Sequence, residues 1–487
     1  MLVKNRTIPI VAIALLLASM LTIFMTADER YVAIPGFACV IVVLWLLMKL
    51  WDRDRKFPFI DIGVFCAVGT LVYAVFPLIN YWADGLQFGI LADYRLQMYH
   101  ITSEELGIFH LRHFLYLFSF VIVYALFRGK GSLKLGNVRA PSRSISWIII
   151  TVFCLLSGYF LILQLFSGVN FNTSYEPEAY SKNLAAIASL PLLLVQISSK
   201  LGGLLFLFKL ALLFVVVRKS KKRNWQIILF IWIFLETIQA LIIMGGRTGY
   251  ILFLMATALF YHRMVKPLKF KFLVFAGVSL LFLFILLGLY RSYFDVEEMQ
   301  ADLGRSNAGI LSSSNEFQSL LGTSYDVLQR KEAGADLPWY LYINDVVAIL
   351  PPQQIIPVSK VAASEWYLRE IGLDDTGQGF MWGVISQSVV GADWYELAIR
   401  GAILGYILAL FHRWYLKHQT GFLETILYVF FCITIYCTFR NTTFSFLTNI
   451  VWQVLPFLLI LRLFSGQRLF QYNTDLDRKV AVSTSNI

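Results

Sequence analysis

Five arginines stand where a membrane protein has little topological reason to place them. Arg247 and Arg440 lie in short polar turns (GGRTG and TFRNT), Arg291 ends an apolar run, Arg305 follows it, and Arg400 lies two turns inside a later run. Guanidinium groups at one membrane depth repel one another unless they share an anion, and their planar fork suits phosphate. The set predicts a site for an anionic, lipid-borne ligand. Taken singly, each arginine is equally well explained by snorkelling to head groups or by pairing with an acid.

Acidic residues accompany one of these arginines with the spacing of a helix face. In the segment DWYELAIR, Asp393, Glu396 and Arg400 are three and four residues apart. A carboxylate beside an arginine stays ionised and can take a proton from a hydroxyl as general base. The alternative is a plain ion pair between Glu396 and Arg400. Glu316 and Asp345 are weaker candidates for the acid, and a structural or solvated role is favoured for both.

The elements that must position these residues are membrane-spanning helices. The chain has 487 residues, of which 58% are apolar and 15% charged, and its mean hydropathy is +0.68. Apolar runs recur at about the 20-residue length that a helix needs to cross a bilayer, which excludes a soluble enzyme with one anchor and disfavours a β-barrel. We predict an all-α polytopic membrane protein with about 12 transmembrane helices. The predicted spans are residues 7–26, 31–50, 58–80, 106–127, 146–167, 190–217, 224–244, 248–263, 270–290, 393–411, 422–438 and 444–463.

The net charge of +11 is explained by membrane topology. Basic residues gather in alternate connections, as in 49–56, 128–143, 218–223 and 263–271. The positive-inside rule therefore predicts that both termini are cytoplasmic and that the five arginines above face the opposite side. Nucleic-acid binding is accordingly disfavoured.

The spans divide the chain into four regions. Residues 1–290 hold predicted spans 1 to 9, residues 291–392 form one large external loop, residues 393–463 hold spans 10 to 12, and residues 464–487 form a polar cytoplasmic tail. Loops of such length usually carry function. Within this loop, residues 337–351 are apolar and aromatic but too short to span, which favours an interfacial or re-entrant helix.

Other polar residues in the spans have simpler explanations. Lys209 and Glu236 lie deep in adjacent antiparallel spans, so they are expected to pair. The histidines fall into two groups: polar packing rather than metal binding is favoured for His100, His110 and His113, and a place in cytoplasmic loops is expected for His262, His412 and His418. No nucleotide-binding loop and no metal-type spacing occurs, so neither cofactor nor metal is predicted.

Several of these features together resemble a known family. The GGRTGY turn, the large external loop with its ILPP segment, the WYE segment through Gly401 to Gly405, and the Arg440 turn are similar to Wzy-type O-antigen and oligosaccharide repeat unit polymerases. The likeness covers roughly residues 195–463. It implies a GT-C-like architecture, related to O-antigen ligases, in a bacterial inner membrane with the active site facing the periplasm.

The resemblance also implies a reaction. A metal-independent inverting glycosyltransferase of this kind moves the growing glycan from undecaprenyl pyrophosphate to the non-reducing end of a new lipid-linked repeat. Arg247, Arg291 and Arg440 would grip the donor pyrophosphate, and Glu396 would activate the acceptor hydroxyl. The remaining substrate-binding candidates are Arg305, Arg400, Asp393, Glu316, Tyr290 and Tyr395.

The choice of base stays open among four acids: Glu396, Asp393, Glu316 and Asp345. The expected partners are the two lipid-linked oligosaccharides, membrane lipids and a chain-length regulator. Two alternatives to the polymerase are considered. The resemblance implies that an O-antigen ligase would carry a histidine in its large external loop, and residues 291–392 contain none, so a ligase is disfavoured. A polysaccharide transporter or flippase is disfavoured because the sequence shows no related halves.

Overall fold

The protein is built from helices. The computed structural model describes residues 7–54, 60–88, 93–131, 133, 136, 138–167, 191–242, 247–269, 277–279, 282, 315–335, 337–347, 349–350, 363–372, 381–435 and 437–465. No β-strand occurs within these ranges. The prediction of an all-α protein is confirmed for this part of the chain.

Seven helical runs within the described ranges are long and apolar enough to cross a membrane. They are α2 (Ala27–Asp54), α3 (Ile62–Ala83), α5 (Ser103–Phe127), α6 (Arg143–Ser167), α8 (Leu192–Lys219), α18 (Trp394–His418), and the continuous run of α21 (Phe446–Asn449), η4 (Ile450–Val454) and α22 (Leu455–Ser465). Each matches a predicted span, which supports a polytopic membrane protein. Below, the outer end of a helix is the end on the side predicted to be external.

Four more predicted spans coincide with helices. α1 (Thr7–Ile23) and α19 (Phe422–Thr434) are apolar but shorter, while α9 (Arg223–Ile242) and α10 (Arg247–Met264) match predicted spans seven and eight. Predicted span nine, residues 270–290, lies almost entirely outside the described ranges. The total of twelve spans therefore stays a prediction.

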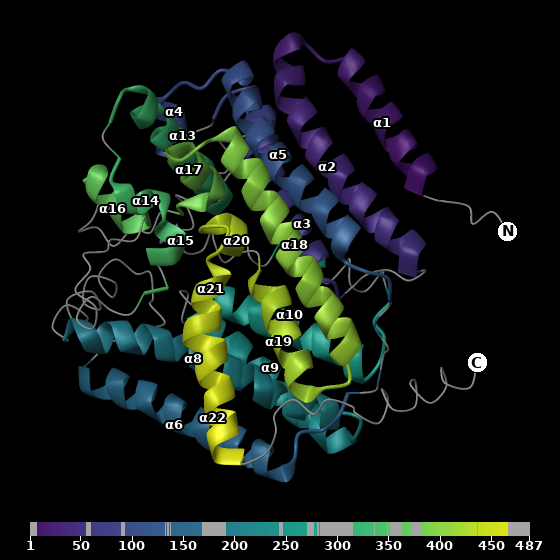
Figure 1. Ribbon diagram of the computed structural model, residues 1–487, viewed down its shortest axis with the longest axis vertical. Coiled ribbons are helices and arrows are strands. Elements are labelled where there is room, and N and C mark those ends of the chain that lie inside the picture. The colour runs from purple at the N-terminus through teal and green to yellow at the C-terminus, as the bar shows by residue number, and fades with distance from the viewer. Residues whose placement is uncertain are drawn as a thin grey trace, which may run out of the picture.

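Close packing of α18 on α5 fixes the outer end of α18. The two helices run side by side, with α2 on the far side of α5 (Figure 1). A Cβ atom on Gly401 would lie 2.4 Å from the carbonyl oxygen of Tyr116, and one on Gly405 would lie 2.5 Å from that of Phe120. Small residues four apart let membrane helices approach this closely, so both positions require glycine.

The large loop forms a group of short helices. These are α13 (Asn315–Glu332), α14 (Trp339–Tyr342), α15 (Asn344–Val347), α16 (Ala363–Glu370) and α17 (Gly383–Val390), which lie together with α4 (Tyr94–Met98) on one side of the molecule (Figure 1). Every residue of α17 is buried, because this helix packs against α13, α18 and α20 (Cys437–Arg440). Part of the large loop thus belongs to the core.

The helix predicted across residues 337–351 is two four-residue helices that break at Ile343. The two residues after the break have side chains that bond distant groups. The side-chain oxygen of Asn344 accepts the N–H of Ala363, and the carboxylate of Asp345 binds Arg400. These bonds attach the second short helix to α16 and α18.

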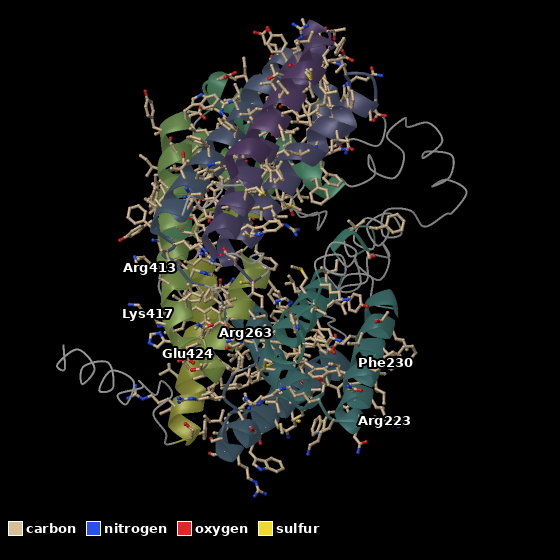
Figure 2. All side chains as sticks on the ribbon, turned by 90° about the vertical axis from the view of Figure 1, so that its right-hand side faces the viewer. Arg223, Phe230, Arg263, Arg413, Lys417 and Glu424 are labelled. Carbon is tan, nitrogen blue, oxygen red and sulfur yellow. The ribbon has the colours of Figure 1, made fainter. Side chains whose placement is uncertain are left out.

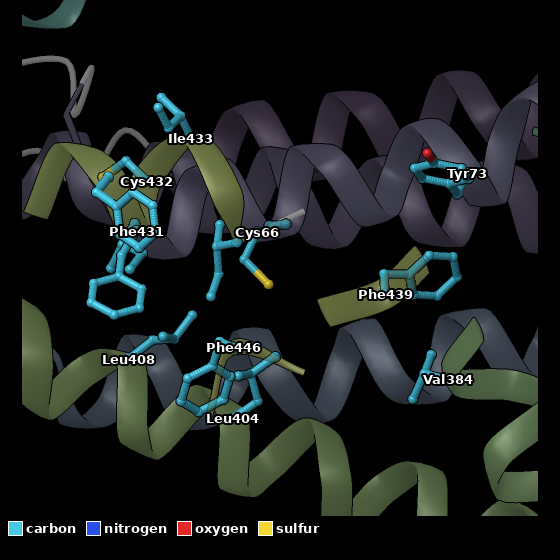
Figure 3. Close-up of a cluster of buried hydrophobic side chains, with 14 of the residues drawn as sticks. Cys66, Tyr73, Val384, Leu404, Leu408, Phe431, Cys432, Ile433, Phe439 and Phe446 are labelled. Atoms are coloured by element: carbon cyan, nitrogen blue, oxygen red, sulfur yellow. The ribbon is translucent and has the colours of Figure 1, made fainter. Parts of the chain in front are cut away.

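Buried apolar side chains hold α20 in place. Figure 3 shows Phe439 of α20 opposite Tyr73 of α3, and the two ring centres are 5.8 Å apart. Phe446 of α21 lies near Leu404 of α18 in the same cluster. Arg440 directly follows Phe439, so the backbone position of this arginine is set by the core.

Three basic residues on the side predicted to be cytoplasmic lie in the same half of the molecule. Figure 2 shows Arg223, Arg263 and Lys417 in its lower half. Arg263 is buried and donates to the carbonyl oxygen of Gln419 at 2.6 Å. Arg263 therefore ties the end of α10 to the turn after α18.

Candidate functional site

Arg400 lies at the centre of a largely buried ion-pair network near the outer end of α18. Its Nη1 donates to Asp345 Oδ2 at 2.5 Å, and its Nε donates to Glu396 Oε1 at 2.6 Å. The side chains of Arg400 and Asp345 are 10% and 9% exposed, and that of Glu396 is 20% exposed. The predicted common helix face is confirmed for Glu396 and Arg400, whereas Asp393 lies before the helix. The contact of Glu396 with Arg400 is the ion pair considered as an alternative.

Asp345 also joins this network to the turn that follows Arg440. Its Oδ1 accepts the backbone N–H of Phe444 at 3.1 Å, and the guanidinium carbon of Arg400 lies 5.6 Å from the centre of the Phe444 ring. The side chain of Arg440 is half-buried. One carboxylate therefore connects the large loop, α18 and the segment that carries a predicted donor-binding arginine.

A second ion pair holds the first residue before α18. Arg112 of α5 binds Asp393 with two parallel bonds, Nε to Oδ1 and Nη2 to Oδ2, both 2.8 Å long. The guanidinium also lies 4.8 Å from the centre of the Trp394 ring. Asp393 has φ 49° and ψ −114°, a conformation that favours glycine, and such strain persists only where the surroundings enforce it. The bidentate pair supplies that enforcement.

The charges of this cluster determine what it can bind. Two arginines, Arg112 and Arg400, face three carboxylates, Asp345, Asp393 and Glu396. Lys331 adds a third positive charge beside them, because its Nζ donates to the carbonyl oxygen of Gly391 at 3.1 Å. Two of the carboxylates already occupy Arg400. The cluster suits proton acceptance better than phosphate binding.

Glu396 is the carboxylate best placed to accept a proton. Both oxygens of Asp393 bind an arginine, and Asp345 is more deeply buried than Glu396. In Glu396 only Oε1 binds an arginine, because Oε2 accepts the backbone N–H of Ala392 at 3.0 Å. A carboxylate oxygen has room for a second donor, so Glu396 Oε2 keeps capacity for a substrate hydroxyl.

The other predicted site residues are placed as follows. The side chain of Tyr395 is 80% exposed. Arg247 is the first residue of α10, and Glu316 is the second residue of α13. Tyr290, Arg291 and Arg305 lie outside the described ranges. The described residues thus bring Asp345, Glu396 and Arg400 to residues 437–444, the Arg440 segment. The approach of Arg247 and Arg291 to this group stays a prediction.

Arg112 was missed by the sequence analysis although the same criterion applies to it. It lies near the outer end of α5, on the side where the positive-inside rule does not place basic residues. Its neighbours His110 and His113 drew attention instead. These two histidines are buried and stack with ring centres 4.7 Å apart, whereas His100 is exposed, so the expected packing role holds for two of the three.

A buried polar network fixes the large loop, and the sequence analysis missed it too. Arg95 binds Asp93 and donates to the hydroxyl of Thr323 at 2.8 Å and to that of Tyr367 at 3.0 Å. Tyr367 in turn donates to Asp326 at 2.7 Å. Burial is the main cause that raises the pKa of Tyr367, so its hydroxyl stays a donor. The network joins α4, α13 and α16.

The pairing of Lys209 with Glu236 is confirmed. Lys209 Nζ donates to Glu236 Oε2 at 2.6 Å, and the indole N–H of Trp232 donates to the other carboxylate oxygen at 3.1 Å. Lys209 also lies 5.0 Å from the centre of the Phe253 ring. The pair neutralises the charge that α8 and α9 carry in the apolar layer.

The loop positions expected for His262, His412 and His418 are wrong, because His262 lies in α10 and the other two lie in α18. His412 is fully buried in α18, which continues to His418 rather than ending near residue 411. Its Nε2 lies 3.6 Å from Asp61 Oδ2, and its Nδ1 is hydrogen-bonded to the hydroxyl of Tyr428. Polar residues on one face of α18 end the apolar run in the sequence. The other face stays buried beyond them, and the helix continues to His418.

Comparison with protein families, with curated proteins and with solved structures finds no match to this chain. Within the described ranges no group of three or more His, Cys, Asp or Glu residues is arranged to hold a metal ion. The residues of the site are therefore the only indication of its chemistry.

Proposed function

We propose that the protein polymerises lipid-linked oligosaccharide repeat units at the outer face of a bacterial inner membrane. The growing glycan leaves its undecaprenyl pyrophosphate and joins the non-reducing end of a new lipid-linked repeat. The observation that carries this proposal is the bonding of Asp345 to both Arg400 and the Phe444 N–H. This contact gathers a candidate base, the large loop and the Arg440 segment at one end of α18.

Glu396 acts as general base in the proposed reaction. Its carboxylate takes the proton of the acceptor hydroxyl, while the acceptor oxygen forms a bond to the anomeric carbon of the donor glycan. The bond from that carbon to the pyrophosphate oxygen breaks, and direct displacement inverts the configuration. Arg400 positions the Glu396 carboxylate by donating to its Oε1 at 2.6 Å.

The leaving pyrophosphate gains charge as its bond breaks. Arg247, Arg291 and Arg440 stabilise this charge through charge-assisted hydrogen bonds. The cluster around Arg400 stays separate from this role, because its two arginines are engaged by carboxylates. The proposal thus assigns the acceptor hydroxyl to Glu396 and the donor pyrophosphate to the three arginines.

The experiment is a size analysis of surface polysaccharide on a gel. A strain lacking the gene is compared with the same strain carrying the wild-type copy. The proposal predicts that the deletion strain shows one band, a single repeat on the final acceptor, and that the restored gene returns the ladder. Loss of all glycan from the acceptor, with long lipid-linked chains accumulating outside, would show a ligase instead.

A further inference from the structure

Lys200 is a membrane-embedded cation that the proposed reaction does not use. It is the first residue of the candidate span within α8, at the end away from Arg218 and Lys219, which places it at the outer end. The side chain is half-buried, and no carboxylate of the described ranges forms an ion pair with it. Its Nζ lies 5.9 Å from the centre of the Trp452 ring. Charges at membrane depth tend to mark binding sites.

The packing of α8 shows that Lys200 lies on a face turned into the bundle. Gly203 is three residues later, on the same helix face. A Cβ atom on Gly203 would lie 2.4 Å from the side-chain nitrogen of Gln453, so this face touches η4 directly. The contact of Lys200 with Trp452 belongs to the same interface.

The partner element η4 is a π-helix inside the last span. Such single turns are rare and frequently mark functional sites. Within η4, the indole N–H of Trp452 donates to the carbonyl oxygen of Ile349 at 3.2 Å, and Gln453 donates to Asn449 Oδ1 at 3.0 Å. Ile349 is four residues after Asp345 in the large loop. The surroundings of Lys200 are thereby tied to the segment that carries the Asp345–Arg400 pair.

We propose that Lys200, beside the indole of Trp452, binds the phosphate group of a membrane lipid at the outer face. An ammonium group binds phosphate as a point charge, and the indole face adds a cation–π contact that holds it. This inference rests on the proposed function for the identity of the lipid. The transfer brings two lipid-linked pyrophosphates together, the three arginines serve the donor, and Lys200 serves the acceptor.

The test counts lipids on the purified full-length protein by native mass spectrometry. Undecaprenyl pyrophosphate is titrated onto the wild type, K200Q, K200R and the control K221Q, whose lysine is exposed at the opposite end of α8. We expect two bound copies on the wild type and K221Q. In K200Q the affinity of one copy falls about tenfold to a hundredfold, and K200R retains most of it.

Phosphatidylglycerol in a parallel titration identifies the source of the phosphate. Weakening of this lipid alone in K200Q would assign the site to a phospholipid head group and overturn the acceptor role. Unchanged binding of both lipids would overturn the site itself. If K200Q does not fold, W452L carries the test, because it removes the ring and keeps the lysine, and unchanged binding by W452L would overturn the proposal.

The result separates this inference from the proposed function. Loss of one undecaprenyl pyrophosphate in K200Q, together with a normal polysaccharide ladder in the deletion strain, would remove the polymerase and keep the lipid site. Loss of the ladder on deletion, together with unchanged lipid binding by K200Q, would keep the polymerase and remove the lipid site.

Discussion

Asp345 and Arg400 are 55 residues apart in the sequence and meet in an ion pair of 2.5 Å whose two side chains are about nine-tenths buried. The pair anchors the large loop on α18. Asp345 also accepts the backbone N–H of Phe444, four residues after Arg440. The same carboxylate therefore positions the Arg440 segment beside α18. The geometry of the candidate site depends on it.

Replacing Asp345 with alanine is predicted to destabilise the protein. Removal of Asp345 leaves Arg400 paired with Glu396 but takes one of its buried partners away and leaves the Phe444 N–H unbonded. Loss of a partner by a buried polar group typically lowers the free energy of unfolding by about 1–3 kcal/mol. Unfolding of the purified protein in detergent measures the change. The control is Glu365→Ala, which breaks an exposed pair with Arg369 and should lower that free energy by about 1 kcal/mol or less. Equal effects of the two substitutions would contradict the anchoring role.

Alanine at Arg247, Arg291 or Arg440 is predicted to abolish long chains while the protein still inserts. Each substitution removes a charge-assisted bond to the leaving pyrophosphate, which slows transfer about tenfold to a hundredfold. Lysine at the same position keeps the charge but loses the fork, so partial activity is expected. A polysaccharide gel and an immunoblot of the membrane fraction give the two readouts.

The matched control for these arginines is Arg462→Ala. Arg462 is exposed in the last turn of α22, at the end assigned to the cytoplasm. This variant should make chains of normal length. Normal chains from all three outer arginine variants as well would reject the donor-binding assignment.

The strain at Asp393 predicts that Asp393→Gly changes the free energy of unfolding in opposite directions in two backgrounds. Arg112→Met should destabilise the protein, because Asp393 loses the bidentate partner that holds it at φ 49°. Adding Asp393→Gly to that variant should recover about 1–3 kcal/mol of unfolding free energy, since glycine adopts this conformation without strain. In the wild-type background Asp393→Gly should instead destabilise, because Arg112 is left unpaired. Destabilisation by glycine in both backgrounds would argue against stored strain.

Arg95 is predicted to hold the large loop without touching substrate. Its side chain is 2% exposed and bonded to Asp93, so Arg95→Met leaves a buried carboxylate unpaired and should lower the unfolding free energy by about 3–5 kcal/mol. Limited proteolysis should then cut residues 315–370 faster than in the wild type. Arg369→Met, which removes an exposed arginine from the same loop, should leave the cleavage rate unchanged. Equal cleavage of both variants would contradict the anchoring by Arg95.

Features that depend on nearby residues or on the membrane itself could be predicted from the sequence. Seven helices match predicted spans, because a run of about 20 apolar residues has few other uses. The Glu396–Arg400 contact follows from the i, i+4 spacing of one helix. The Lys209–Glu236 pair follows from the high free energy of an unpaired charge in the apolar layer.

The contacts that complete the candidate site have no such local signal. Asp393 and Arg112 are 281 residues apart, and Asp345 reaches Arg400 from a different helix. Helix packing decides these pairings, and one sequence does not reveal which helices are neighbours. The π-helix at 450–454 likewise has no local signal, because its composition is that of an ordinary apolar span.

The most direct measurement is chain elongation by the purified protein in liposomes, supplied with lipid-linked repeat units from a strain that lacks the gene. Glu396→Gln keeps the size of the side chain but removes the proton acceptor, so elongation should slow about a hundredfold to ten-thousandfold while lipid binding persists. Glu365→Gln, the exposed control, should elongate like the wild type. Absence of elongation by the wild type would contradict a polymerase, and wild-type elongation by Glu396→Gln would contradict its role as the base.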